Sequence, residues 1–241
     1  RVQPNPLGKG YILWGQAKSM DKPFAGPVYR MKASEGTYVP DTALSLPEHA
    51  NVYNFVQADL NGSGEAFTVM IGPGHTLQVW RNPHDQQYKG GEIYGMSAKF
   101  IQTEGWTDPS NVGEEDVWNF IPTRLVLNDL DGDGRAEIVV VQNKDSMEGL
   151  FQKLRMMYRG TIFSFYWNGM SLVENWRTPR ISGYLTDYTI ADVGNVGRPA
   201  LIMAVVQTDM QGFWEKGTGH IVAFTLKPQS EKTPAKKEEG L

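Results

Sequence analysis

A nine-residue segment that begins with aspartate occurs three times in this sequence, at residues 59–67, 129–137 and 192–200. The three copies align without gaps, and their first aspartates lie 70 and 63 residues apart. Each copy follows a short apolar run and precedes a more apolar one. Short apolar runs separated by Gly, Asp and Asn are typical of strands joined by turns. We therefore expect each copy to be the loop of a β-hairpin in a repeated structural unit.

The residues around these segments repeat as well. Val140-Val141-Gln142 recurs as Val205-Val206-Gln207, and residues 160–165 recur in similar form as residues 219–224. Val, Ile, Tyr and Phe are concentrated in short runs typical of antiparallel strands, at 11–14, 52–56, 68–71, 77–80, 125–127, 138–141, 161–167, 188–190, 201–206 and 220–226. The sequence therefore predicts an all-β fold, a β-propeller of four-stranded antiparallel blades over residues 1–226, as a partial ring of three to four blades.

Two segments depart from the strand pattern. Residues 147–158 place apolar side chains, Leu150 and Phe151 among them, on one side of a possible short helix, and we expect helix only there. Residues 227–241 lack apolar side chains until Leu241, so they bury too little apolar surface to offset the entropy cost of ordering. We expect a flexible polar tail over these residues.

A partial ring leaves strands without partners at its two ends. We expect those edges at residues 11–14 and 220–226, and we expect the second of them to pair with strands outside its own repeat. Because unpaired strand edges recruit other strands, the chain is expected to self-associate or to remain bound to a protein partner.

Composition excludes several classes of function. The longest uninterrupted apolar run, residues 200–206, is far shorter than the roughly 20 residues of a membrane-spanning helix, so no membrane span is expected. The formal charge is −4 with dispersed Lys and Arg, which argues against a nucleic-acid partner. The chain has no cysteine, and its four histidines lack the spacing of a zinc site or a catalytic triad. We expect a protein that is not an enzyme.

The second copy of the repeated segment has the composition of a calcium loop. Carboxylates stand at its positions 1, 3, 5 and 9, which are Asp129, Asp131, Asp133 and Glu137. Ca²⁺ binds hard oxygen ligands, and a cluster of carboxylates without a cation would suffer mutual repulsion. Gly134 permits a sharp turn that would aim the carbonyl of Arg135 at the ion. The alternative is a polar hairpin turn that binds no metal, since Asp and Gly favour turns by themselves.

An EF-hand is a poor match, because its twelfth position needs a bidentate Glu and Val140 stands there. The motif and its apolar flanks resemble instead the FG-GAP or VCBS repeat of integrin α-subunit propellers and of secreted bacterial proteins, whose pattern is Asp-x-Asp-x-Asp-Gly-x-x-Asp. The resemblance implies a calcium site with Asp129, Asp131, Asp133 and Glu137 as side-chain ligands and Arg135 as a carbonyl ligand. Glu137 departs from the family's Asp at the last position. The resemblance, together with the high calcium concentration outside cells, implies an extracytoplasmic location.

The other two copies are degenerate. Asp59, Asn61 and Ser63 retain oxygen atoms, but Phe67 replaces the last ligand, so a weak or vestigial site is expected. The third copy keeps only Asp192, and we expect its carboxylate to accept hydrogen bonds from amides of its own turn.

Two functional interpretations remain open from the sequence. Each of the last two repeats inserts an apolar, Met-bearing segment between strands, and Leu150, Phe151, Phe213 and Trp214 are candidates for binding a protein partner. The chain would then be a non-enzymatic interaction or structural module. The alternative is a carbohydrate-binding lectin or a polysaccharide lyase, because similar repeats occur in propeller lyases. A convergent cluster of basic and acidic side chains in a central or rim pocket would favour that alternative, and a flat aromatic face would favour the interaction module.

Overall fold

The computed structural model describes residues 1–5, 9–19, 22–103, 117–146, 155–207 and 217–226. Strands dominate these residues, and the one helical element among them is a three-residue 3-10 turn, η1 (Pro73–His75). The strands are β1 (Val2–Pro4), β2 (Tyr11–Ala17), β3 (Ala25–Ser34), β4 (Thr37–Ala43), β5 (Phe55–Ala58), β6 (Phe67–Ile71), β7 (Thr76–Asn82), β8 (Asp85–Ile93), β9 (Phe100–Thr103), β10 (Val117–Phe120), β11 (Val126–Asn128), β12 (Glu137–Asp145), β13 (Met157–Trp167), β14 (Leu172–Arg177), β15 (Ile181–Ser182), β16 (Tyr184–Ala191), β17 (Ala200–Gln207) and β18 (Thr218–Thr225).

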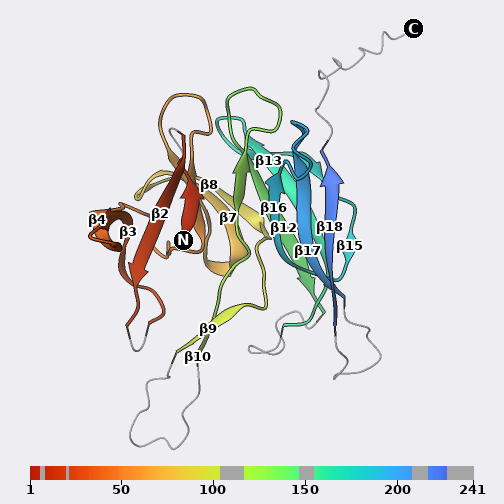
Figure 1. Ribbon diagram of the computed structural model, residues 1–241, viewed down its shortest axis with the longest axis horizontal. Helices are drawn as coiled ribbons and strands as arrows, with labels where there is room; N and C mark the ends of the chain where they lie inside the picture. The colour runs from red at the N-terminus through yellow and green to blue at the C-terminus, as the bar shows by residue number, and fades with distance from the viewer. Residues whose placement is uncertain (6–8, 20–21, 104–116, 147–154, 208–216, 227–241) are drawn as a thin grey trace, which may run out of the picture.

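Four antiparallel sheets are arranged as the blades of a four-blade propeller (Figure 1). The first sheet has the order β1-β2-β3-β4, and the second has the order β5-β6-β7-β8. The third has the order β11-β12-β13-β14, with β15 also paired to β13, and the fourth has the order β16-β17-β18. The expectation of an all-β propeller is confirmed. The hairpin of β9 and β10, which the sequence did not predict, lies between the second and third sheets in the chain.

Burial explains why these segments form strands. In β17, Leu201, Met203 and Val205 are buried, whereas the residues between them are partly exposed. This alternation with a period of two is that of a sheet with one covered face. Residues 138–141 of β12 are all completely buried, because the third sheet packs between its neighbours on both faces.

Three apolar clusters join consecutive sheets. Trp14 and Phe55 belong to the cluster between the first and second sheets. Phe67 packs near Trp167 between the second and third sheets, with ring centroids 6.4 Å apart. Val141 of the third sheet and Leu185 of the fourth share the last cluster. Burial of apolar side chains at these three interfaces is the main force that holds the sheets together.

A buried asparagine adds a polar link between sheets. Asn143 of β12 is 2% exposed, and its Nδ2 donates to the carbonyl oxygens of Met96 and Leu185 at 2.9 and 3.0 Å. Its Oδ1 accepts a hydrogen bond from the amide of Leu185 at 3.2 Å. One side chain thereby satisfies three backbone groups that water cannot reach, and it ties the third sheet to β16 and to the segment after β8.

The expected edge at residues 11–14 is wrong, because these residues lie in β2, an interior strand flanked by β1 and β3. The short strand β1 has only three residues, with the polar side chain of Gln3 buried, so it leaves no strand pattern in the sequence. The expected edge at residues 220–226 is confirmed, because β18 is the last strand of its sheet in the described part of the chain. The expected pairing of this edge outside its own repeat is not found there: the described partner of β18 is β17, and consecutive strands pair at a smaller entropy cost than strands far apart in the chain.

The helix expected over residues 147–158 is also not supported at its end. Met157 and Tyr158 open the eleven-residue strand β13, where Met157 is buried and pairs with Asp145 across the sheet. Residues 147–154 lie outside the described residues, as does the expected tail over 227–241.

The expected strand over 52–56 begins only at Phe55, because Asn54 lies in a turn. The side chain of Asn54 accepts a hydrogen bond from the amide of Asn51 and donates one to the carbonyl of Ile71.

Within the described residues, no helix is long and apolar enough to cross a membrane.

Candidate metal centre

The three repeated segments occupy the same place in three sheets. They connect β5 to β6, β11 to β12 and β16 to β17, which are the first two strands of the second, third and fourth sheets. Each loop is closed by a strand pair in the same register: Ala58 with Phe67, Asn128 with Glu137, and Ala191 with Ala200. The predicted repeat of hairpin loops is therefore confirmed. The first sheet, whose first two strands are joined without such an aspartate, is the repeat that the sequence did not reveal.

The first aspartate holds each loop in shape. In the second loop, the two carboxylate oxygens of Asp129 accept hydrogen bonds from the amides of Gly132 and Gly134 at 2.7 and 3.0 Å. Both glycines have positive φ angles, 77° and 83°, which place these amides toward the carboxylate. The turn is thus stabilised by Asp129 before any metal is considered, as the alternative of a polar turn requires.

Three carboxylates converge in this loop. One oxygen each of Asp129, Asp131 and Glu137 lies within 4.8 Å of the others, and this is the one such acidic or histidine group among the described residues. Asp129 and Asp131 are exposed, but Glu137 is only 3% exposed. A buried carboxylate next to two others is unfavourable unless a proton or a cation compensates for it. The arrangement fits a divalent cation that binds hard oxygen ligands.

The pKa of Glu137 reflects this environment. The pKa of Glu137 is raised from 4.5 to about 7, mainly by burial and also by the neighbouring charges of Asp131 and Asp129. A hydrogen bond of 2.7 Å from the amide of Leu130 to Oε2 acts in the opposite direction, because it favours the ionised form. The ionised form of Glu137 is therefore unfavourable unless a cation compensates for its charge.

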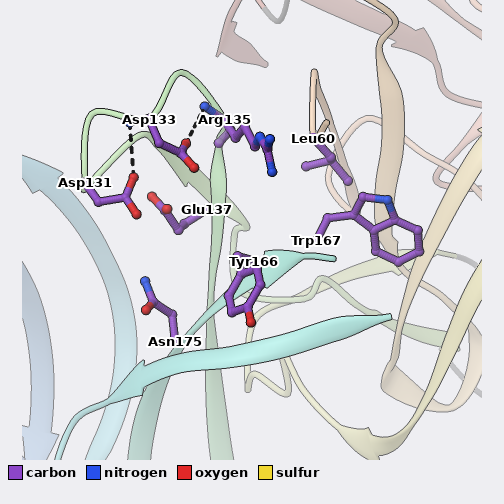
Figure 2. Close-up of a pocket in the computed structure, with 9 residues that line it drawn as sticks. Leu60, Asp131, Asp133, Arg135, Glu137, Tyr166, Trp167 and Asn175 are labelled. Atoms are coloured by element: carbon purple, nitrogen blue, oxygen red, sulfur yellow. Dashed lines mark hydrogen bonds between the residues drawn. The ribbon is translucent and has the colours of Figure 1, made fainter. Parts of the chain in front are cut away.

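A small cavity of about 110 Å³ opens beside the loop (Figure 2). Its wall includes the predicted ligands Asp131, Asp133 and Glu137, and the facing strands β13 and β14 contribute Tyr166 and Asn175. Figure 2 shows Asn175 below the carboxylates of Asp131 and Glu137. Neither Tyr166 nor Asn175 was expected at the site. Their position depends on how β13 and β14 pair with β12, which the loop sequence does not contain.

Two of the predicted ligands, Asp133 and the carbonyl of Arg135, are not part of the group of three carboxylates. Asp133 lines the cavity but lies outside the group of three carboxylates, and its Oδ1 accepts a hydrogen bond from the amide of Arg135 at 2.8 Å. The ligand role of the Arg135 carbonyl stays a prediction. Three of the four predicted carboxylates are thus brought together, and the side chain of Asp133 would have to move closer to join them.

The other two loops use their side chains for the turn. Asp59 accepts hydrogen bonds from Gly62 and Gly64 at 2.8 Å each, Asn61 accepts from Ser63, and Ser63 accepts from Glu65. At the last position, Phe67 is 2% exposed in the apolar core and offers no ligand.

In the third loop, Asp192 accepts hydrogen bonds from the amides of Val196 and Gly197 at 3.1 and 2.7 Å. This confirms the expectation that it stabilises its own turn.

The candidate partner-binding residues Leu150, Phe151, Phe213 and Trp214 lie outside the described residues. Their role stays a prediction.

Comparison with known proteins does not assign this chain to a family. The chain matches no protein-family model, no curated protein and no solved structure.

Proposed function

We propose that this protein is a calcium-stabilised β-propeller that serves as a non-enzymatic interaction or structural module outside the cytoplasm. The observation that carries the proposal is the convergence of Asp129, Asp131 and Glu137 within 4.8 Å, with Glu137 buried. A bound cation would neutralise this group and tie the β11–β12 loop to the strand that ends it.

The donor set favours calcium over other metals. All three side chains offer carboxylate oxygens, and the group contains no histidine or cysteine of the kind that zinc and copper prefer. Ca²⁺ takes about 6 to 8 oxygen ligands, so backbone carbonyls, water and a rearranged Asp133 would complete its coordination. Magnesium is a weaker candidate because it demands near-octahedral geometry and releases its water reluctantly.

The resemblance to FG-GAP or VCBS repeats supports the same proposal. The three loops have one register and one place in their sheets, which is the organisation expected of a duplicated calcium hairpin. Sites of this kind outside cells have dissociation constants of about 10⁻⁴ to 10⁻³ M and are filled by extracellular calcium. The proposed location outside the cytoplasm rests on the resemblance and on the high calcium concentration there.

Replacing Asp131 with asparagine tests the calcium site. Asp131 accepts one hydrogen bond in the loop, from the amide of Asp133 at 3.2 Å, and an asparagine oxygen can still accept it. We expect the loop to keep its shape and the affinity for calcium to fall by more than about tenfold, because one charged ligand is lost. Isothermal titration of the full chain with CaCl₂ measures the effect.

The matched control is Asn61→Ala, which changes the equivalent position of the degenerate first loop. It should leave the titration unchanged. The proposal fails if the unsubstituted chain shows no calcium binding below about 10 mM, or if Asn61→Ala weakens binding as much as Asp131→Asn does.

A further inference from the structure

A depression of about 340 Å³ lies on the third sheet, away from the calcium loop, and positive charge surrounds it. Its wall includes Lys144 of β12, Arg159 of β13, Arg177 of β14 and Arg180 of the following segment. Within the described ranges of the chain, no aspartate or glutamate lines it. A site of this volume is at the lower end of the range of about 300 to 1,000 Å³ that small-molecule sites occupy.

The strand register creates this concentration of charge. Lys144 and Arg159 are direct partners across β12 and β13, so both side chains project from the same face of the sheet. Like charges directly opposite each other destabilise a sheet. Such a pair is favourable only if something neutralises it.

Among the described residues, carboxylates of the protein pair with one of these four cations. Arg177 has a carboxylate partner, Glu174, at 3.2 Å, and both side chains are substantially exposed. Among the described residues, no ion pair joins Lys144, Arg159 or Arg180 to a carboxylate. Three cations without a carboxylate partner in the described part of the chain therefore border one depression, although the guanidinium of Arg159 lies 5.0 Å from the centroid of the Tyr158 ring. Such a concentration of positive charge attracts anions.

Neutral hydrogen-bonding groups in the same wall narrow the ligand class. Thr161 and Thr178 contribute hydroxyl groups, and Gln142 donates its Nε2 to the carbonyl of Ile93, which leaves its side-chain oxygen free to accept from a ligand. Phe163 is 7% exposed and offers no open ring face on which a nucleobase could stack. A ligand that carries both carboxylate and hydroxyl groups would use the guanidinium groups and the neutral groups together.

We infer that this depression binds a sugar acid of the uronate type, either free or as a unit of an anionic polysaccharide. The cations of Lys144, Arg159 and Arg180 face its single carboxylate group, and Gln142, Thr161 and Thr178 face its hydroxyl groups. The hydroxyl of Thr178 accepts a hydrogen bond from the amide of Ile162 at 3.1 Å and can still donate to the ligand. The site shares no residue with the calcium loop, so it does not depend on the proposed function.

Titration of the full chain with galacturonate and with its linear trimer tests the inference, at low salt, without added calcium and without a chelator. Galactose is the neutral control ligand. We expect both acids to bind and galactose not to bind. If the trimer binds more than about tenfold tighter than the monomer, the ligand is a polysaccharide unit, and equal affinities indicate the free sugar acid. Because exposed charges are screened by salt, binding should weaken in 0.5 M NaCl.

Lys144→Gln should weaken the binding of galacturonate by about tenfold or more, since hydrogen bonds to charged groups are the stronger ones. The matched control Arg198→Gln makes the same change of net charge on the exposed β16–β17 loop and should alter affinity by less than about twofold. In thermal unfolding without ligand, Lys144→Gln should be at least as stable as the unsubstituted chain, because it removes a like-charge pair.

Three outcomes would overturn the inference. One is the absence of uronate binding at millimolar concentration. Another is equal or tighter binding of inorganic phosphate or of an Asp-rich hexapeptide, which would mean a general anion site or a site for acidic peptides. The third is a loss of uronate affinity in Arg198→Gln as large as that in Lys144→Gln, which would mean that net charge rather than this depression attracts the ligand.

Discussion

Replacing Asn143 with alanine is expected to lower the free energy of unfolding by about 3 to 5 kcal/mol. The substitution leaves the carbonyls of Met96 and Leu185 and the amide of Leu185 without the partners that they now have. Each unsatisfied buried polar group costs about 1 to 3 kcal/mol, and a small cavity adds to the loss. Because these groups belong to the junction between the third and fourth sheets, the transition should also become less cooperative. Urea unfolding followed by tryptophan fluorescence measures both effects.

Asn168→Ala is the matched control. The side chain of Asn168 accepts hydrogen bonds from the amides of Met170 and Ser171 at 2.9 and 2.8 Å, but it lies in an exposed turn where water can replace it. A loss of about 1 kcal/mol is expected there. Equal losses for the two variants would contradict the role of Asn143 as a link between sheets.

Replacing Glu137 with glutamine is expected to have two opposite effects. The response of the melting temperature to calcium should disappear, because the buried ligand loses its charge. Without calcium, the variant should be more stable than the unsubstituted chain at pH 8, by up to about 3 kcal/mol, because glutamine needs no ionisation in a buried site. Its side-chain oxygen can still accept the hydrogen bond from the amide of Leu130.

The direction of the pH dependence follows from the raised pKa of Glu137, from 4.5 to about 7. A carboxyl group with a higher pKa in the folded state favours folding fully below its unfolded pKa, and this contribution is lost as the pH rises through the folded pKa. The stability difference between the variant and the unsubstituted chain in EDTA should therefore be small near pH 4.5 and largest at pH 8. Urea unfolding at both pH values checks this. A stability difference that stays the same at both pH values would contradict the raised pKa of Glu137.

The sequence predicted the repeated hairpins because Asp59, Asp129 and Asp192 act locally: each carboxylate binds amides within five residues. Local hydrogen bonds leave a local pattern. The first sheet could not be identified in this way, since it has no such aspartate.

The sites were predicted less completely than the loops. Spacing placed Asp131 and Glu137 together correctly, but it could not show that Asp133 turns to the amide of Arg135. The opposition of Lys144 and Arg159 depends on the register of two strands whose connection passes through residues 147–154, so fifteen residues of sequence separate the pair. A register between such strands is set by packing rather than by a motif.

The self-sufficient turn of the three loops has an evolutionary consequence. In each loop the first aspartate holds the backbone, and the side chains at positions 3 and 5 that accept further turn hydrogen bonds in the first two loops are absent from the third. The third loop has Gly194 and Val196 at these two positions, and its hairpin persists with Asn195 and Gly197 at positive φ. The shape of such a hairpin and its capacity to bind an ion can therefore change independently in evolution.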